Sequence, residues 1–227
     1  VVTNAEVMHT YSTLLRRSPQ LGLRRFVMSK KRYSMSVFVI YVGTRRKFPG
    51  ILHHNILFGP RYKGLLDDIF HRGTLADDFS LYLHAPTESD PSLAPEGGGS
   101  YYVLSPVPNL AKGLIDWEKE APAYADRILG YLEKRVMPGL RSEIVTQRIV
   151  TPKYFENDLN SYQGAAFSLE PLLSQSAFFR THNREPSLDG LYFVGAGTHP
   201  GAGLPGVVGS AKATVGVILN DLGLHAP

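Results

Sequence analysis

The sequence predicts an α+β fold in which a series of strands is followed by a C-terminal strand–loop–helix unit. Three observations support this prediction. Short apolar runs separated by turn residues occupy residues 37–104, apolar residues recur at helical spacing over residues 121–136, and a glycine-rich loop joins a short apolar run to a second helical pattern after residue 190. With 227 residues, of which 43% are hydrophobic, the chain is long enough to bury a substantial core.

The individual elements follow from apolar periodicity and from the turn residues between them. In chain order we expect strands over 37–42 and 51–58, a short helix over 64–70, a strand over 79–84, a surface loop over 86–100, a strand over 101–104, a helix over 121–136, a strand over 143–150, a short helix over 152–159, a strand over 191–194 and a helix over 207–222. The first two strands can form a hairpin across Phe48-Pro49-Gly50. The last helix places several apolar residues on one face, namely Val208, Ala211, Val215, Ile218, Leu219 and Leu222.

Basic residues are concentrated in one segment. Residues 7–66 contain no Asp or Glu and 12 of the 24 Lys and Arg residues, whereas the rest of the chain has 12 basic and 20 acidic residues. Such a segment can pair with acidic groups of the same protein, lie on an anionic membrane surface or bind nucleic acid. Apolar side chains alternate with the charges over residues 14–28, which favours a membrane surface over nucleic acid.

Several chemistries are excluded or disfavoured by residue content. The sequence has no cysteine, which excludes disulfides, thiolate metal sites and cysteine nucleophiles. The longest apolar run, residues 37–42, is far shorter than the roughly 20 residues of a membrane-spanning helix. The histidines His53, His54, His71 and His84 lack the spacing of an H-E-x-x-H zinc motif. We therefore predict no metal site.

Glycines cluster between the last predicted strand and the last predicted helix. Residues 201–206 match G-x-G-x-x-G, but six residues separate them from Val194, and no strand with an acidic end follows in the given sequence, so a primary adenine-dinucleotide site is not indicated. Small residues nevertheless let backbone N–H groups approach a flat or anionic ligand, and the start of the next helix offers it free N–H groups. The alternative is a tight turn whose glycines serve packing alone.

The same segment carries a family resemblance. Residues 191–212 resemble the C-terminal signature of bacterial-type phytoene desaturases, the FAD-dependent desaturases of carotenoid synthesis. Further similar stretches are residues 1–5, 58–62, 78–86, 93–97, 137–141 and 166–171. The resemblance covers the whole chain and implies that it corresponds to the C-terminal half of such a protein, without the N-terminal dinucleotide-binding half.

This resemblance implies a domain organisation. An α+β substrate domain would be joined to the C-terminal strand–loop–helix of an α/β FAD/NAD(P)-binding, Rossmann-like flavoprotein fold. Residues 1–5 would be the end of a truncated FAD-binding region, residues 6–178 a substrate- and membrane-facing domain, and residues 179–227 the FAD-contacting segment.

The resemblance also implies a function, the FAD-dependent desaturation of phytoene towards lycopene. Its partners would be phytoene and related carotenoid intermediates, a membrane lipid surface and an electron acceptor such as a quinone or oxygen, without nucleic acid, and it would be cytoplasmic and peripheral on the membrane. The residues expected to line the flavin are Gly195, Gly197, Thr198, Gly206, Val207 and Val208.

Two points stay open. Glu170 and His199 are candidates for a catalytic base, but Glu170 can equally form an ion pair and His199 can equally hydrogen-bond the turn, so no catalytic residue is assigned. The alternative function is a non-catalytic membrane- or lipid-binding fragment that cannot hold FAD alone.

Overall fold

The computed structural model describes residues 1–224, which divide into two compact units. Residues 35–154 form what we call the sheet unit, and residues 1–34 together with those from 155 onwards form the glycine-loop unit. The boundaries of these units differ from those of the predicted domains, which were residues 1–5, 6–178 and 179–227. They differ because the first 34 residues pack with the C-terminal part of the chain.

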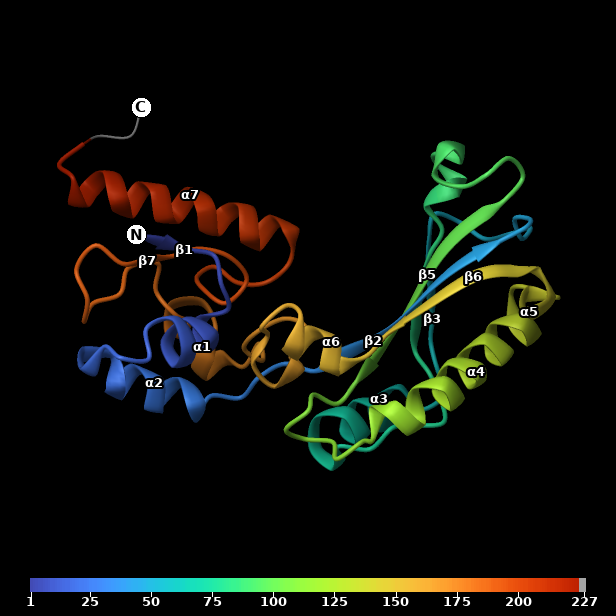
Figure 1. The fold of residues 1–227 in the computed structure, drawn as a ribbon, viewed down its shortest axis with the longest axis horizontal. Coiled ribbons are helices and arrows are strands. Elements are labelled where there is room, and N and C mark those ends of the chain that lie inside the picture. The colour runs from blue at the N-terminus through green and yellow to red at the C-terminus, as the bar shows by residue number, and fades with distance from the viewer. Residues whose placement is uncertain (225–227) are drawn as a thin grey trace. The chain divides into compact units, whose positions relative to one another are not determined.

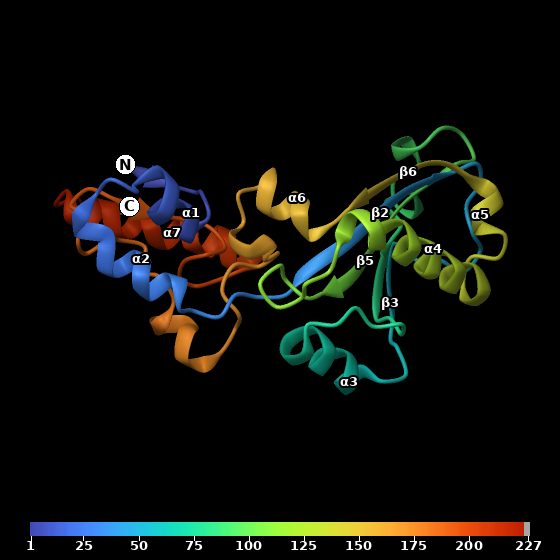
Figure 2. The same ribbon diagram turned by 60° about the horizontal axis from the view of Figure 1, so that its bottom comes forward.

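The sheet unit is built on five strands in the order β3-β4-β5-β2-β6, and every neighbouring pair is antiparallel (Figure 1). Its strands and helices are β2 (Ser36–Thr44), β3 (His54–Leu57), α3 (Tyr62–Asp67), β4 (Leu81–His84), β5 (Gly99–Val107), α4 (Trp117–Arg135), α5 (Leu140–Glu143) and β6 (Ile144–Val150). Both views place α3 and the loop before β5 at opposite ends of the sheet (Figures 1 and 2).

The predicted hairpin between the first two strands is wrong. Both strands form, but β2 lies between β5 and β6, whereas β3 pairs with β4. The reason is visible in burial: β2 is buried on both faces over residues 36–40, as a central strand must be, while β3 alternates between exposed and half-buried side chains, as suits an edge.

Helix α4 covers one face of the sheet and closes the core (Figure 1). The predicted helix is confirmed, and it begins four residues earlier, at Trp117, where the Asp116 side chain accepts a hydrogen bond from the Glu118 N–H. The fully buried Phe38 ring of β2 lies 5.7 Å from Trp117 and 5.0 Å from Tyr124, centroid to centroid. Aromatic and aliphatic burial therefore holds this unit together.

The glycine-loop unit contains two short parallel strands and the C-terminal helix. Its strands and α-helices are β1 (Val2–Thr3), α1 (Val7–His9), α2 (Gly22–Ser29), β7 (Tyr192–Phe193) and α7 (Leu204–Asp221), and α6 (Pro152–Asn157) spans the boundary in sequence. Helix α7 lies along β7, where the Thr214 hydroxyl donates to the Phe193 carbonyl at 2.9 Å (Figure 1).

The buried face of α7 is polar. Ser210 and Thr214 are 0% and 2% exposed, whereas Val208 and Val215 of the predicted apolar face are 67% and 53% exposed. The hydroxyls face inward because they satisfy backbone and side-chain groups of the loop and β7, which the valines cannot do. Among the described helices, none is both long enough and apolar enough to cross a membrane.

Candidate functional site: the glycine loop and the start of helix α7

The loop between β7 and α7 is tied to the helix by Ser210. The Gly195 N–H donates to the Ser210 hydroxyl at 3.0 Å, and the Thr198 hydroxyl lies 2.8 Å from the same oxygen and donates to the Gly195 carbonyl at 3.0 Å. Thr198 is 1% exposed, so its side chain belongs to this internal network. The structure thus brings Gly195 and Thr198 together beneath the first turns of α7.

Asn183 completes this network from a neighbouring segment. Its side-chain amide donates to the Thr214 hydroxyl at 3.0 Å and to the His199 carbonyl at 3.1 Å, and it is 7% exposed. Sequence reasoning missed Ser210, Thr214 and Asn183. The signal available was the pair of hydroxyl residues four apart on a mostly apolar helix.

Three of the predicted flavin-lining glycines have packing reasons of their own. A Cβ on Gly195 would lie 2.6 Å from Asn4 Oδ1, and one on Gly197 would lie 2.7 Å from Val7 Cγ2. A Cβ on Gly206 would lie 2.5 Å from the carbonyl oxygen of Gly201. At these positions a side chain is excluded by the unit's own interior, as the packing alternative expected.

The outer side of the loop is open. Gly203, directly before α7, has φ +91°, and a Cβ there would meet no atom within 4 Å. The first turn closes with the Val207 N–H donating to the Gly203 carbonyl at 2.8 Å, so the N–H groups before Val207 have no partner within the helix. Val207 is half-buried and Val208 is exposed beside them. This end of α7 offers backbone donors and apolar surface to a ligand.

A buried cation lies beneath the loop. Arg180 is 5% exposed, donates from Nη2 to the Ala196 carbonyl at 2.6 Å and has no hydrogen-bond partner at Nε. Nε would lie 3.6 Å from a Cβ on Gly201. No carboxylate of the described chain lies within ion-pair distance of this guanidinium, and its burial lowers its pKa. A buried charge without a counterion is costly, so the site favours an anionic ligand.

The two candidate bases have structural roles. Glu170, which is 7% exposed, pairs with Arg32 through contacts of 2.9 Å and 3.0 Å. The exposed His199 has Nδ1 3.2 Å from the Ala177 carbonyl, and its backbone N–H donates to the Thr181 carbonyl at 2.9 Å. Each group therefore interacts with protein partners, in line with the alternative roles given above: an ion pair for Glu170 and hydrogen bonding within the turn for His199.

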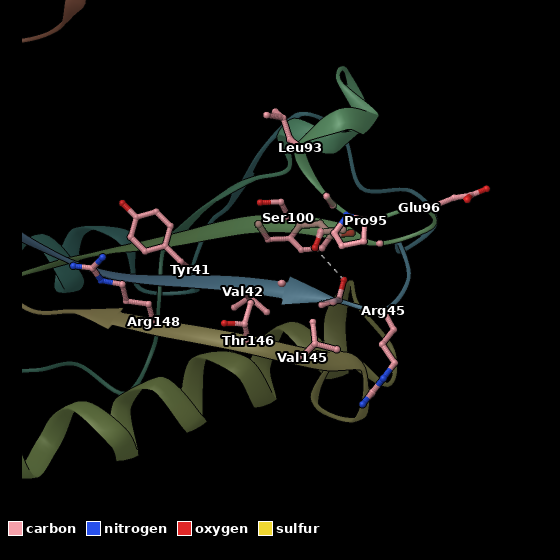
Figure 3. Close-up of a pocket in the computed structure, with 16 residues that line it drawn as sticks. Tyr41, Val42, Arg45, Leu93, Pro95, Glu96, Ser100, Val145, Thr146 and Arg148 are labelled. Carbon is pink, nitrogen blue, oxygen red and sulfur yellow. Dashed lines mark hydrogen bonds between the residues drawn. The ribbon is translucent and has the colours of Figure 1, made fainter.

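A separate cavity of about 520 Å³ lies in the sheet unit, beside the end of β2 and the starts of β5 and β6. Figure 3 shows Tyr41 and Arg148 on neighbouring strands at one side of it and Leu93 and Pro95 on the loop before β5. Val145 of β6 adds a third apolar wall. The surface of the cavity is mainly apolar and aromatic, with the charged residues Arg45, Glu96 and Arg148 also among those that line it, which suits a largely apolar ligand.

Helix α2 carries an exposed surface that is both basic and apolar. Leu23 and Phe26 are 73% and 61% exposed. Arg24 instead lies 3.4 Å from the buried Glu185 carboxylate, and Arg25 donates to the Tyr11 carbonyl at 3.0 Å, so these two cations are used internally. The preceding segment lies against α2, because Arg25 donates to the Leu15 and Arg16 carbonyls. What we call the α2 surface consists of the exposed residues of α2, its C-cap and that segment, namely Leu14, Arg16, Arg17, Leu23, Phe26 and Lys30.

Comparison with known proteins agrees with the resemblance seen in the sequence. The chain is 55% identical over 222 residues to the lycopene-forming phytoene desaturase of Pantoea ananas and 46% identical to the neurosporene-forming phytoene desaturase of Rhodobacter capsulatus. These matches cover 98% and 96% of this chain but 45% and 42% of those proteins. The chain therefore spans less than half the length of the curated relatives it matches.

A solved structure and a family model extend the comparison. The crystal structure of an oxidoreductase from Methanosarcina mazei has a TM-score of 0.51 at 14% identity, covering 96% of this chain and 42% of that one, which shows a shared fold. A model of the family described as flavin containing amine oxidoreductase matches residues 5–219. The fold is thus that of a flavoprotein, and the chain belongs to the flavin containing amine oxidoreductase family.

Proposed function

We propose that this chain is part of a carotenoid desaturase that removes hydrogen from phytoene and leads towards lycopene. The observation that carries the proposal is its identity of 53–55% to three phytoene desaturases named as lycopene-forming. A quinone or oxygen would reoxidise the cofactor, and this electron acceptor stays a prediction.

The open end of the glycine loop supports FAD as the cofactor. We propose that Gly195, Gly197, Thr198, Gly206, Val207 and Val208 form the flavin-contacting segment, with the first two glycines and Thr198 shaping the loop from within. Arg180 would be the cation available to an anionic group of the cofactor. FAD, when bound, supplies the hydride acceptor for C–H oxidation. The residues at the start of α7 would position it and exclude water.

The exposed face of α7 supports a larger assembly. Its apolar residues, among them Val208, Val215 and Leu222, lie on the surface of the described chain. The relatives are about twice as long as this chain. We propose that a dinucleotide-binding part covers this face and completes the FAD site. The portion of the relatives that this chain does not match is long enough to contain such a part.

The sheet unit would hold the substrate. Its cavity is bordered by Tyr41, Leu93, Pro95 and Val145. These side chains offer apolar and aromatic surface, which suits a polyene because a hydrocarbon chain forms no hydrogen bonds. The exposed Arg148 lies at the margin. We propose residues 35–154 as the core of the substrate domain, within the predicted range of 6–178.

A chimera tests the desaturase proposal. Replacing the matching region of the Pantoea ananas relative by this chain should give a protein that retains flavin and converts phytoene to coloured products. A chimera that folds and keeps flavin but forms no product would refute the substrate, and one that folds but never retains flavin would favour the non-catalytic alternative.

The role of Arg180 is tested in the same chimera. Arg180→Met should lower the fraction of bound flavin at least tenfold, whereas the exposed Arg17→Met should leave it unchanged. Flavin content is read from absorbance, and circular dichroism verifies that each variant is folded. Equal flavin content in both variants would contradict a role for Arg180 in flavin binding.

The α2 surface supports peripheral membrane association, which a polyene substrate dissolved in a bilayer would require. Phe26 and Leu23 would enter the interface, and Arg16, Arg17 and Lys30 would meet anionic headgroups. Replacing Leu23 and Phe26 by Ser should weaken sedimentation with anionic vesicles severalfold. Substituting the exposed Leu52 and Ile56 by Ser is the matched control, and equal loss in both variants would contradict the assignment.

A further inference from the structure

Three imidazoles meet at the β3–β4 edge of the sheet, away from the cavity. His54 is the first residue of β3 and His84 the last of β4, and they are direct cross-strand partners. His53 directly precedes β3. Local spacing gives no reason to group these residues, because 29 residues of chain separate His54 from His84 and only strand pairing brings them together.

The donor atoms are close enough to share one ion. His53 Nε2 lies 2.9 Å from His84 Nε2, and one ring nitrogen from each of the three histidines lies within 4.8 Å of the others. Two nitrogens bound to one tetrahedral zinc ion at 2.0–2.1 Å are about 3.3 Å apart. The observed separations bracket that value, so small rotations of the three imidazole side chains would complete the site.

Hydroxyl groups orient two of the rings. His53 Nδ1 lies 2.6 Å from the Ser89 hydroxyl, and His54 Nδ1 lies 2.6 Å from the Tyr82 hydroxyl. Where the hydroxyl accepts a hydrogen bond from Nδ1–H, the Nε2 lone pair is free, which is the arrangement found around histidine ligands of metals. His53 and His84 are half-buried and His54 is exposed, so an ion can reach the cluster from solvent.

We propose that His53, His54 and His84 bind a divalent transition-metal ion of the zinc class, with water in the fourth position. Three imidazoles suit Zn²⁺, Ni²⁺ and Cu²⁺ and do not suit Mg²⁺ or Ca²⁺, which prefer oxygen ligands. The ion would link β3, a four-residue edge strand, to β4 and would stabilise this edge of the sheet.

Zinc titration of the full 227-residue chain against a chromophoric chelator tests the site. We expect one Zn²⁺ per chain, with affinity reduced at least tenfold in His54→Gln and in His84→Gln. The matched control is His71→Gln, which removes an exposed imidazole elsewhere in the sheet unit and should leave the affinity unchanged. Circular dichroism verifies the fold of each variant.

Tyr82→Phe sharpens the test, because it keeps the ring and removes only the hydroxyl beside His54. We expect its zinc affinity to fall by about 10–100-fold, the usual effect of losing a group that orients a ligand. Zinc binding that is equal in the wild-type chain and in the His53→Gln/His54→Gln/His84→Gln variant would overturn the proposal. No flavin or carotenoid enters this experiment, so its outcome is independent of the desaturase proposal.

Discussion

Both units bury an apolar core, but the glycine-loop unit also buries a polar network beside its loop. In the sheet unit, Phe38 is enclosed by Trp117 and Tyr124, and aliphatic side chains fill the rest of the interior. In the glycine-loop unit, the buried Glu185 carboxylate accepts a 2.5 Å hydrogen bond from Tyr11. Apolar burial has no direction, whereas buried polar groups must keep specific partners. Apolar burial stabilises both units, and in the glycine-loop unit the buried polar network also fixes the geometry of the loop before α7.

The largest effect is expected in the apolar interior. Phe38→Ala should lower the free energy of unfolding by about 3–5 kcal/mol, because it removes a fully buried ring that contacts two others. Urea denaturation followed by the fluorescence of Trp117, the single tryptophan, measures it. The control Tyr41→Ala removes a ring that is 49% exposed and should lower the free energy of unfolding much less. Equal losses would show that the two sites are packed alike.

An intermediate effect is expected at Gly197 in the other unit. Gly197→Ala should destabilise by about 1–3 kcal/mol, because its Cβ would lie 2.7 Å from Val7 Cγ2. Adding Val7→Ala should recover part of this loss in the double variant, measured by urea denaturation without flavin. Recovery would show that packing alone requires the glycine. A single variant as stable as the wild type would contradict the packing explanation.

The smallest effect is a pH dependence from Glu6. Burial raises the pKa of the Glu6 carboxyl above its ordinary value of 4.5, although hydrogen bonds from the His9 and Met8 N–H groups and from Ser168 oppose this. The folded chain therefore holds the proton more tightly than the unfolded chain, and stability falls as pH rises from 4.5 through the raised pKa.

The variant Glu6→Gln removes this titration. Its stability relative to the wild type should improve between pH 4 and pH 7, as measured by urea denaturation at each pH. The exposed Glu118→Gln serves as control, and a difference between Glu6→Gln and wild type that does not change with pH would refute the burial argument.

Much of the secondary structure could be predicted from the sequence, but the pairing of the strands could not. The periodicity of Ala125, Ile128 and Leu132 predicts α4, and the run at residues 37–42 predicts β2, because both patterns are local. The partners of β2 are β5, about 60 residues further along the chain, and β6, about 100 residues further along. The local sequence of β2 does not specify either pairing. The wrong hairpin follows from assuming that neighbours in sequence also pair.

The candidate site shows the same division. The glycine segment and its family resemblance were visible from residues 191–212 alone, since glycine content and motif are properties of sequence. Arg180 gave no signal, because it becomes part of the site only when its segment folds beneath Gly201.

Sequence by itself determined the family, the positions of the main helices and strands, and the place of the glycine-rich segment before α7. Tertiary structure decided which face of α7 is buried, which glycines serve packing, and which histidines meet. The physical reason is that composition and periodicity act over a few residues, whereas strand pairing and burial join segments far apart in the chain.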